Sequence, residues 1–467
     1  MQTLPLFKNH QRKMKSSTPT RIIILGSGFA GVEVLKRLQK EFRNDESTVI
    51  TMISRDNFFL FTPMLPEVAT GTVETRHIVA PVRSFCKTAS FYEATVQLID
   101  LNDKRIVAMH EIGRNNLSFD IREHILFYDY LVIAVGSENN FFGIEEIKEN
   151  ALTMKSIADA SILRNHVIEI LEQAHVEQDD MNLRRSLLTF AVVGGGFTGI
   201  ETVGELTDFI KDTVRDYYKN ISMTDIKILL INSKDKILQQ VDEELGEFAL
   251  KYLKKMGVEF IMNTHVINAN KNSIMLDNGS IIPCYTLVWS AGVTTSDLIK
   301  NLDCKLDSEH RIITDDYLEV PGFPGVYALG DCAAATDHLT GRPYPQTAQH
   351  AIREGKVVAE NIISTIYKKE HKKKRFNYKA KGMMADIGKR NGVAIIFGIK
   401  LHGFIAWWLW RTYYLVNMPT IHKKLEVLID WTSHIFFRRD VAMIKRFIWD
   451  KPKSSNPDPY DRFSTAA

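Results

Sequence analysis

Two glycine-rich segments of the chain have the spacing that binds a dinucleotide. Residues 26–31 read GSGFAG and residues 194–199 read GGGFTG. In such a segment the first glycine permits a tight turn, the second lets a pyrophosphate approach backbone N–H groups, and the third lets a helix pack closely on a strand. One such segment is weak evidence, because glycine also serves ordinary turns. Two of them predict two dinucleotide sites in one chain.

The residue that ends the second strand of each unit is expected to meet a ribose. An acidic residue is usual there, but Ser54 holds this position in the first unit and Asn232 in the second. Ser54 can hydrogen-bond a hydroxyl, and Arg55 or Asp56 can assist. Without a carboxylate to repel a 2′-phosphate, and with Lys234 close by, the second site is not expected to exclude NADPH. The choice between NADH and NADPH therefore stays open.

Asp331 follows the hydrophobic run at residues 326–329 and has two interpretations. It can cap a helix that begins at Cys332. Alternatively, its carboxylate binds the ribityl hydroxyls of a flavin. Its place in the last element of a chain with two nucleotide sites favours the second interpretation.

Three further polar residues could serve a redox reaction. Glu201 is expected in the first turn of the helix after the second glycine segment, where an acid commonly compensates the helix dipole. Beside an anion-binding turn, however, a carboxylate can instead face the nicotinamide. Gln349 and Arg353 are four residues apart and share a helical face. Either this helix is simply amphipathic, or its start lies against the flavin and Gln349 addresses a carbonyl-bearing acceptor.

Apolar runs must position these residues. Residues 21–25 and 188–193 each precede a glycine segment and a helix, and residues 48–53 and 226–231 supply the next strands. This βαβ order predicts an α/β fold with two Rossmann-like, doubly wound domains. The predicted boundaries are a basic, disordered tail at 1–20, a FAD-binding domain at 21–152 and 313–377, an inserted NAD(P)H-binding domain at 153–312, and a C-terminal region at 378–467. Met14 is an alternative start to Met1.

Composition excludes several classes of function. The formal net charge of the 467 residues is only +3, and no recognition-helix signature accompanies it, so we expect no nucleic acid partner. The four cysteines are scattered, with no C-x-x-C pair and no histidine–cysteine cluster, which predicts neither a disulfide framework nor a metal site.

In this order, the motifs resemble those of the type II NADH:quinone oxidoreductases. These single-subunit flavoproteins feed respiratory chains without pumping protons. The resemblance covers residues 21–446 and rests on GSGFAG, DNFFLFTPMLPEVATG, LVIAVGS, VVGGGFTGIE, VWSAGV, VYALGDCA, TAQHAIREG and the aromatic C-terminal segment. It implies an enzyme that passes a hydride from NADH to FAD and then two electrons to a membrane quinone, with NADPH left open as a donor.

The resemblance also assigns residues to sites. The FAD site contains Gly26, Ser27, Gly28, Phe29, Ala30, Gly31, Ser54, Arg55, Ala134, Gly136, Gly330, Asp331 and Ala348. The nicotinamide nucleotide site contains Gly194, Gly196, Phe197, Thr198, Gly199, Asn232, Ala291 and Gly292. Glu201 matches the family glutamate of hydride transfer and quinone coupling, and Gln349 matches the first glutamine of the A-Q-x-A-x-Q quinone motif. Arg353 replaces the second glutamine, which removes an acceptor, adds a charge and predicts a changed quinone orientation or type.

Two alternatives remain at this point. A sulfide:quinone oxidoreductase shares fold and acceptor but needs polysulfide-carrying cysteines beside the flavin, a pattern that the four cysteines lack. A flavin-binding redox sensor or interaction protein would bind the same cofactors with negligible turnover. The aromatic, basic C-terminal region favours a substrate from the lipid side.

The C-terminal region is expected to lie on a membrane without crossing it. Residues 393–416 are long enough to span a bilayer, but Lys400, His402 and Arg411 interrupt them, and each charge at mid-bilayer costs roughly 2.5–3.5 kcal/mol. Five aromatic residues suit the headgroup boundary: Trp407, Trp408, Trp410, Tyr413 and Tyr414. Residues 425–437, flanked by Lys and Arg, predict an amphipathic anchor on anionic lipid. A dimer interface would use the same residues, and both can hold. The family resemblance implies peripheral membrane binding as a homodimer, and we expect the cytoplasmic or matrix face because the nicotinamide pool lies there.

Overall fold

The computed structural model describes residues 18–114, 117–380 and 382–443. Several expectations lie outside the described residues: the disordered tail up to residue 17, the alternative start at Met14, and the last part of the C-terminal region with Lys445 and Arg446.

The described chain alternates strands and helices. The strands are β1 (Thr20–Leu25), β2 (Thr48–Ser54), β3 (Phe58–Leu60), β4 (Val79–Pro81), β5 (Ser90–Glu93), β6 (Thr95–Asp100), β7 (Arg105–Arg114), β8 (Leu117–Phe127), β9 (Tyr130–Ile133), β10 (Glu138–Asn139), β11 (Leu152–Thr153), β12 (Thr189–Val193), β13 (Lys227–Ile231), β14 (Val258–Ile261), β15 (Val266–Asn270), β16 (Ser273–Leu276), β17 (Ile281–Pro283), β18 (Thr286–Trp289), β19 (Val293–Thr294), β20 (Ile312–Ile313), β21 (Val326–Ala328), β22 (Ala333–Ala334), β23 (Thr336–Asp337), β24 (Arg342–Pro343), β25 (Gly382–Asp386), β26 (Gly392–Ile396) and β27 (Ile399–Gly403). The α-helices are α1 (Phe29–Glu41), α2 (Leu65–Ala69), α3 (Glu145–Asn150), α4 (Ile157–Val176), α5 (Met181–Leu187), α6 (Phe197–Tyr217), α7 (Glu243–Lys255), α8 (Asp297–Lys300), α9 (Ala348–Ile366), α10 (Phe404–Asn417) and α11 (Ile421–Phe436).

Two parallel five-stranded sheets confirm the predicted α/β fold with two Rossmann-like units. The first has the order β21-β9-β1-β2-β5 and the second the order β11-β18-β12-β13-β14. In each sheet the strand before a glycine segment, β1 or β12, is central. Its carboxyl end therefore lies at the switch point where an open α/β sheet binds its ligand.

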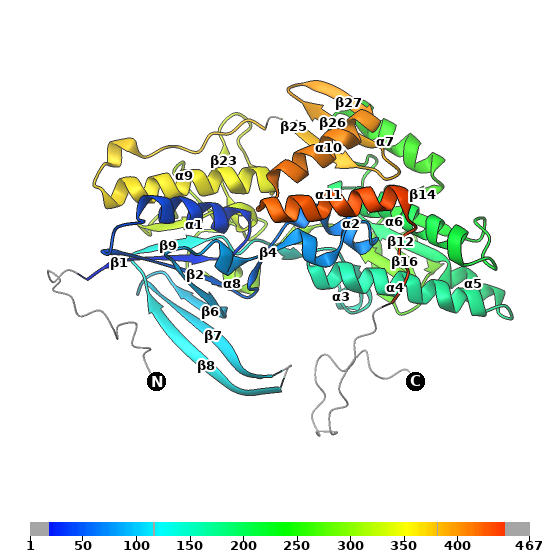
Figure 1. Ribbon diagram of the computed structural model, residues 1–467, viewed down its shortest axis with the longest axis horizontal. Coiled ribbons are helices and arrows are strands. Elements are labelled where there is room, and N and C mark those ends of the chain that lie inside the picture. The colour runs from blue at the N-terminus through cyan, green and yellow to red at the C-terminus, as the bar shows by residue number, and fades with distance from the viewer. Residues whose placement is uncertain (1–17, 115–116, 381, 444–467) are drawn as a thin grey trace.

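Each parallel sheet is covered by helices on one face and by a small antiparallel sheet on the other. Alternate residues of β1 make the two contacts: Ile22 and Ile24 pack with α1, whereas Ile23 and Leu25 pack with residues of β6, β7 and β9. The second sheet does the same between α6 and the sheet β15–β17. Figure 1 shows the long hairpin of β7 and β8 extending away from the helices.

Helices α1 and α9 lie side by side across the first sheet (Figure 1). A Cβ on Gly355 of α9 would lie 2.7 Å from the Ala30 carbonyl oxygen, so glycine is required for this close crossing. The crossing brings the N-terminal ends of both helices to the same end of the sheet, beside the turn at Gly330–Cys332.

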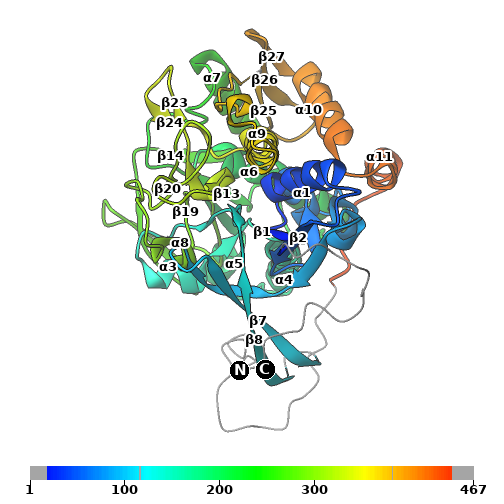
Figure 2. The same ribbon diagram turned by 90° about the vertical axis from the view of Figure 1, so that its left-hand side faces the viewer.

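The C-terminal region packs on the two units rather than extending from them. Figure 2 shows β25–β27 and α10 above α6 and α9, with α11 at the side of the molecule. The apolar run at 393–416 is divided among β26, β27 and α10. Among the described residues, none of the helices has the length and apolar character needed to cross a bilayer.

The predicted aromatic belt is wrong for part of its members. Trp410 and Trp407 are 1% and 9% exposed, and only Trp408, at 54%, faces outward among the three tryptophans. The sequence pattern correctly indicates that these rings form a large apolar surface, but Trp407 and Trp410 are buried inside the protein instead of facing lipid.

Candidate functional site

The first glycine turn is a cradle that side chains would close. Gly26 has φ of +97°, and a Cβ there would lie 2.2 Å from the Ala134 carbonyl oxygen. A Cβ on Gly31 would lie 2.0 Å from the carbonyl oxygen of Gly26. At Gly28, in contrast, a Cβ would meet no protein atom within 4 Å. The middle glycine therefore borders open space, as a turn that admits a pyrophosphate requires.

The second glycine turn repeats this geometry. Gly194 has φ of +118°, and its Cβ would lie 2.6 Å from the Ser290 carbonyl oxygen. A Cβ on Gly199 would lie 1.9 Å from the Gly194 carbonyl oxygen, whereas a Cβ on Gly196 would meet nothing within 4 Å. The two turns thus share two tight positions and one open position.

Both glycine turns lead into helices whose first turns are free of competing groups. Gly28 precedes α1 and Gly196 precedes α6, and neither helix has a side-chain cap or an acidic residue in its first turn. Unpaired N–H groups and the positive end of the helix dipole attract anions. The two turns are therefore chemically suited to two pyrophosphates.

The predicted ribose position of the first unit is polar. The hydroxyls of Ser54 and Ser27 are 2.9 Å apart, and Ser27 also donates to the Phe58 carbonyl at 3.3 Å. Arg55 is exposed beside them. Ser54 therefore lies at the end of β2 with its hydroxyl already linked to the glycine turn.

Asn232 differs from its expected role of facing a ribose. It is 6% exposed, its Oδ1 accepts from the Gly195 N–H at 3.1 Å, and its amide nitrogen donates to the carbonyls of Lys234 and Lys236. Both amide hydrogens are therefore used within the protein. Asn232 therefore stabilises the second glycine turn through the Gly195 N–H, and it has no free N–H to donate to a nucleotide.

Asp331 is held by a side-chain network at the end of β21. It lies in the single 3₁₀ turn Gly330–Cys332, which Leu329 precedes, so the alternative of a cap for a helix at Cys332 is wrong. Its Oδ2 accepts from the Ser137 hydroxyl at 2.7 Å, and Lys155 lies 3.7 Å away.

Glu354, which sequence reasoning missed, supports the same turn. Its buried carboxylate accepts the Gly330 N–H at 2.6 Å, and burial raises its pKa to about 7. Because Glu354 is on α9, this hydrogen bond ties α9 to the turn that carries Asp331.

The remaining predicted residues lie at the same two sheet ends. Phe29 and Ala30 begin α1, Phe197 and Thr198 begin α6, and Ala348 begins α9. Ala134 and Gly136 follow β9 beside the first turn, and Ala291 and Gly292 follow β18 beside the second. The structure thus groups the predicted residues by unit, as the sequence motifs indicated.

Glu201 lies deeper than expected. It is the fifth residue of α6, so it belongs to the second helical turn rather than the first. Its Oε1 accepts from the Trp410 indole N–H at 3.1 Å and from the Asp386 N–H at 3.3 Å. Burial raises its pKa to about 8, with the charges of Glu67 and Glu205 adding to the rise. A carboxyl with this pKa can hold or release a proton near neutral pH.

Gln349 and Arg353 share a small polar cluster at the start of α9. Gln349 donates to the Gly382 carbonyl at 3.2 Å and accepts from the Tyr378 hydroxyl at 2.9 Å. The Arg353 guanidinium lies 4.1 Å from the centre of the Tyr378 ring and donates to the Gln349 carbonyl at 2.9 Å. Arg353 therefore stacks on Tyr378 instead of acting as an extended surface charge.

Strand β25 connects Glu201 with Gln349. Its first residue, Gly382, accepts from Gln349, and the N–H of its last residue, Asp386, donates to Glu201. At about 3.3 Å per residue, the two contacts are roughly 13 Å apart. The C-terminal region therefore joins the N-terminal ends of α6 and α9.

Helix α10 covers this junction with aromatic rings. Tyr414 packs on Trp410 at 4.6 Å and on Phe61 at 5.9 Å, and Phe61 lies 5.7 Å from Phe29 at the start of α1. Sequence reasoning missed Phe61 and Tyr378 and gave Trp410 and Tyr414 a lipid contact. A buried tryptophan usually donates its indole N–H to a polar group. The need of Trp410 for such a partner was the one signal that could have linked it to an acid such as Glu201.

The cysteines offer no redox pair. All four are free thiols, and Cys332, beside Asp331, is fully buried with its sulfur near the carbonyls of Ile133 and Leu329. Burial raises the pKa of Cys332 to about 12, which keeps it a thiol and a poor nucleophile. In the part of the chain that the structure describes, no cluster of potential metal ligands occurs either.

Comparisons with known proteins agree with this geometry. Residues 20–355 match the family model of the pyridine nucleotide-disulphide oxidoreductases, and residues 380–440 match that of the NDH2 C-terminal domain. A probable NADH dehydrogenase of Dictyostelium discoideum is 34% identical over 433 residues, covering 92% of this chain and 93% of the relative. A type II NADH:quinone oxidoreductase of Mycobacterium tuberculosis is 31% identical over 423 residues, covering 88% and 87%. The structure of NDH2 from Plasmodium falciparum in complex with NADH has the same fold, with a TM-score of 0.82 at 22% identity over 91% of this chain and 99% of that one.

Proposed function

Because the chain belongs to the type II NADH:quinone oxidoreductases, we propose that it passes a hydride from NADH to bound FAD and then two electrons to a membrane quinone, without pumping protons. The observation that carries this proposal is the pair of uncapped glycine turns, each with an open middle glycine, on two separate parallel sheets.

FAD, when bound, supplies the redox chemistry by accepting the hydride and returning both electrons. The residues of the first unit fit this group. Gly28 admits its pyrophosphate, Ser54 offers a hydroxyl to a ribose, and Asp331 offers a carboxylate to the ribityl chain. Glu354 orients the Gly330 N–H, and Lys155 and Ser137 hold Asp331 in place.

The second unit would hold NADH as the hydride donor. Gly196 and the first turn of α6 would take its pyrophosphate, and Ala291 and Gly292 would border its nicotinamide end. Glu201 would hold a proton at its carboxyl group close to the reacting rings, while Trp410 fixes the carboxyl position. We propose NADH as the physiological donor.

The quinone would enter beneath α10 and meet the start of α9. Gln349 uses one amide hydrogen toward Gly382 and can donate the other to a quinone carbonyl, while Tyr378 and Arg353 hold its side chain in orientation. Because the Arg353 guanidinium is stacked on Tyr378, we expect its charge to lie at the side of the quinone path and not to contact the quinone carbonyl directly. The aromatic residues of α10 would exclude water from this space.

We further propose that residues 21–152 and 313–377 form the FAD domain, residues 153–312 the NAD(P)H domain and residues 378–467 the membrane and dimerisation region. The strands support the division, because the first sheet draws on residues 20–133 and 326–328 and the second on residues 152–289. Residue 152, at the boundary, already pairs with the second sheet.

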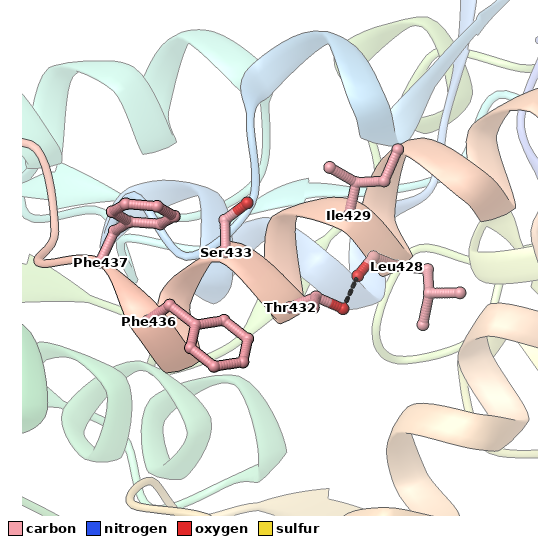
Figure 3. A pocket seen from close by; sticks show the side chains of 6 residues that line it. All are labelled: Leu428, Ile429, Thr432, Ser433, Phe436 and Phe437. Atoms are coloured by element: carbon pink, nitrogen blue, oxygen red, sulfur yellow. Dashed lines mark hydrogen bonds between the residues drawn. The ribbon is translucent and has the colours of Figure 1, made fainter.

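The outer face of α11 would bind the lipid surface. Figure 3 shows Leu428, Ile429, Phe436 and Phe437 around a shallow pocket on this helix. The large apolar side chains exposed on α11 and just beyond it are Ile421, Leu425, Leu428, Ile429, Ile435, Phe436 and Phe437. Adjacent exposed apolar side chains of this kind are typical of a surface that contacts a membrane or another protein. We propose peripheral attachment on the cytoplasmic or matrix face, with a second copy of the chain as an additional partner.

The test uses purified protein. We expect a flavin absorption spectrum, its bleaching by NADH, and steady-state NADH oxidation with a short-chain quinone at about 1–1000 per second. Replacement of all four cysteines by serine or alanine should leave quinone reduction intact. Loss of that activity with flavin still bound would favour a cysteine-dependent sulfide reaction, and flavin bleaching without turnover would favour a redox sensor.

A further inference from the structure

One face of α6 carries four acids in a row. Glu201, Glu205, Asp208 and Asp212 follow one another at spacings of four, three and four residues, which places them on the same side of a helix. At 1.5 Å per residue the row is about 16 Å long. Glu205 and Asp208 are each 6% exposed, whereas Asp212 is partly exposed and pairs with Arg215 on the surface at 3.0 Å. The row therefore runs from the surface to the proposed reaction centre.

Two buried acids from other elements join this row. Glu67 of α2 is 1% exposed and Asp386 of β25 is 2% exposed. Glu205 accepts from the hydroxyls of Thr70 and Thr72, at 2.9 and 3.3 Å. Asp386 accepts from the Gly388 N–H through Oδ1 at 2.7 Å, but its buried Oδ2 has no hydrogen-bond partner. A buried carboxyl oxygen without a partner is costly when charged, and it is free to accept a proton or a hydrogen bond.

Glu205 is the centre of the cluster. On α6 it lies one helical turn from Glu201 on one side and one turn from Asp208 on the other, and Asp212 is one turn further on. Its charge also raises the pKa of Glu67 and Asp386, and the Asp386 N–H donates to Glu201, so both acids lie beside this series.

The cluster holds more acids than cations. Arg411 pairs with Glu67 at 3.2 Å, and Arg439 lies 3.9 Å from Glu205. The other basic groups near the cluster are peripheral: Lys211 donates to the Met256 carbonyl, Lys389 is exposed, and His434 lies beside Arg439. A buried carboxyl without a counter-charge is neutral at ordinary pH, because desolvation penalises its charged form. Burial raises the pKa of Glu67 and of Asp208 to about 7, and that of Asp386 well above its usual range.

The proposed reaction needs a proton that NADH does not bring. NADH, one proton and a quinone yield NAD⁺ and a quinol. The hydride supplies both electrons and one hydrogen nucleus, and the second hydrogen must arrive as a proton from solvent. Because α10 and its aromatic rings cover the reaction centre, this proton requires a path through the protein.

We propose that Asp212, Asp208, Glu205 and Asp386, with Glu67 at their side, relay this proton from the surface to Glu201 for quinone reduction. The inference rests on the proposed function. Asp386 is a relay residue and not a catalytic one, because its backbone N–H contacts Glu201 and its carboxyl group contacts the Gly388 N–H rather than substrate. Each transfer moves one proton between carboxyl groups and changes no oxidation state.

Asp386→Asn tests the relay. Asparagine keeps the acceptor for Gly388 but cannot titrate. Bleaching of the flavin by NADH should be unchanged, since that step takes up no solvent proton. The quinone-dependent step should slow by at least about tenfold, because a positioned proton-transfer group contributes roughly 10²–10⁴-fold. Its solvent deuterium isotope effect should rise, and its pH dependence near neutrality should change. Asp208→Asn, on the surface side of Glu205 in the row, should behave alike if Asp386→Asn does not fold.

Asp297→Asn is the matched control, because Asp297 is an exposed acid of α8 that pairs with Lys300 at 3.0 Å and lies on another element than the row; it should change neither step. A second readout needs no turnover: the infrared band of protonated carboxylic acid in the resting protein at neutral pH should lose intensity in Asp386→Asn and not in Asp297→Asn. If wild-type protein reduces quinone and both row variants match it in rate and isotope effect, the relay is wrong while the function stands. If wild-type protein reduces no quinone, the proposed function itself fails.

Discussion

Single substitutions at Gly28 and Gly196 allow nucleotide binding at each of the two turns to be tested independently of the other. A Cβ at either position meets no protein atom within 4 Å, so Gly28→Val and Gly196→Val should both fold. The added side chain would instead occupy the space that a pyrophosphate needs. Gly28→Val should purify without flavin colour. Gly196→Val should keep its flavin and raise the KM for NADH by at least about tenfold, or about 1.4 kcal/mol.

Absorption spectra, circular dichroism and NADH titrations would check this pair, and each variant serves as the other's control. Flavin retained in Gly28→Val, or an unchanged KM in Gly196→Val, would contradict the assignment of that turn.

Arg353 allows a second prediction at the scale of one residue. Its guanidinium stacks on Tyr378 and donates to the Gln349 carbonyl, so Arg353→Lys should not be a conservative change. Loss of the stack should loosen Tyr378 and, through its hydroxyl, Gln349. We expect the KM for quinone to rise several-fold while the rate of flavin bleaching by NADH stays the same. If only the rate of flavin bleaching by NADH changed, the assignment of Arg353 to the quinone site would be wrong.

Single residues could be predicted from the sequence where backbone geometry dictates them. The glycines of both turns are predictable, because the backbone at these positions passes so close to another backbone segment, or to the expected pyrophosphate, that no side chain fits. Asn232, Glu201 and Trp410 were harder, because their side chains could reach several partners and the sequence does not show which. Asn232 bonds to its own turn, and Trp410 reaches Glu201 from a segment more than 200 residues away in sequence.

At the scale of elements, Arg411 links the C-terminal helices to α2. Its guanidinium lies 4.4 Å from the ring centres of both Trp407 and Trp431 and pairs with buried Glu67. Arg411→Met would leave this carboxylate without a counter-charge. Removing one partner of a buried pair costs about 3–5 kcal/mol in the free energy of unfolding.

This loss should depend on pH. Burial already raises the pKa of Glu67 to about 7, and Arg411 opposes the rise. Without Arg411 the folded-state pKa rises further, while the unfolded-state pKa stays near its usual value of about 4.3. The stability that a raised carboxyl pKa contributes is present at low pH and is lost as pH rises through the folded-state pKa. The difference from wild type should therefore be small near pH 6 and grow above pH 7.

Denaturant unfolding at several pH values would measure this difference. Adding Glu67→Gln to Arg411→Met should remove most of the pH dependence, because the buried carboxyl group that pairs with Arg411 is then gone. A difference that is equal at all pH values would show that Arg411 acts through packing alone.

The elements of the two nucleotide units followed from apolar periodicity, whereas those of the C-terminal region did not. Residues 21–25 and 188–193 form strands within a residue of the predicted limits, because a buried parallel strand must be continuously apolar. The run at 393–416 is equally apolar but is divided into two strands and a helix. Gly398 and Gly403, both with positive φ, mark the breaks. An apolar run alone does not distinguish a buried hairpin from a long helix.

For the whole molecule, the C-terminal region serves two purposes that the sequence could not separate. Its inner face, with Trp410 and β25, closes the proposed reaction centre, and its outer face on α11 remains apolar and exposed. Truncation after residue 379 would therefore disturb both at once. Membrane attachment needs a test that changes only the outer face.

Leu425→Glu with Ile429→Glu changes that face alone. The two side chains are one helical turn apart on α11 and are 54% and 63% exposed, so the substitution should leave the fold and the flavin unaffected. Each aliphatic side chain contributes up to about 1.5–3 kcal/mol when buried in an apolar environment, and binding to vesicles of anionic lipid should weaken by at least about tenfold. Ile162→Glu with Val176→Glu, on exposed positions of α4, is the matched control for charge. Co-sedimentation measures attachment, and light scattering measures mass. If vesicle binding persists while a dimer dissociates, α11 joins two copies of the chain and the lipid contact lies elsewhere.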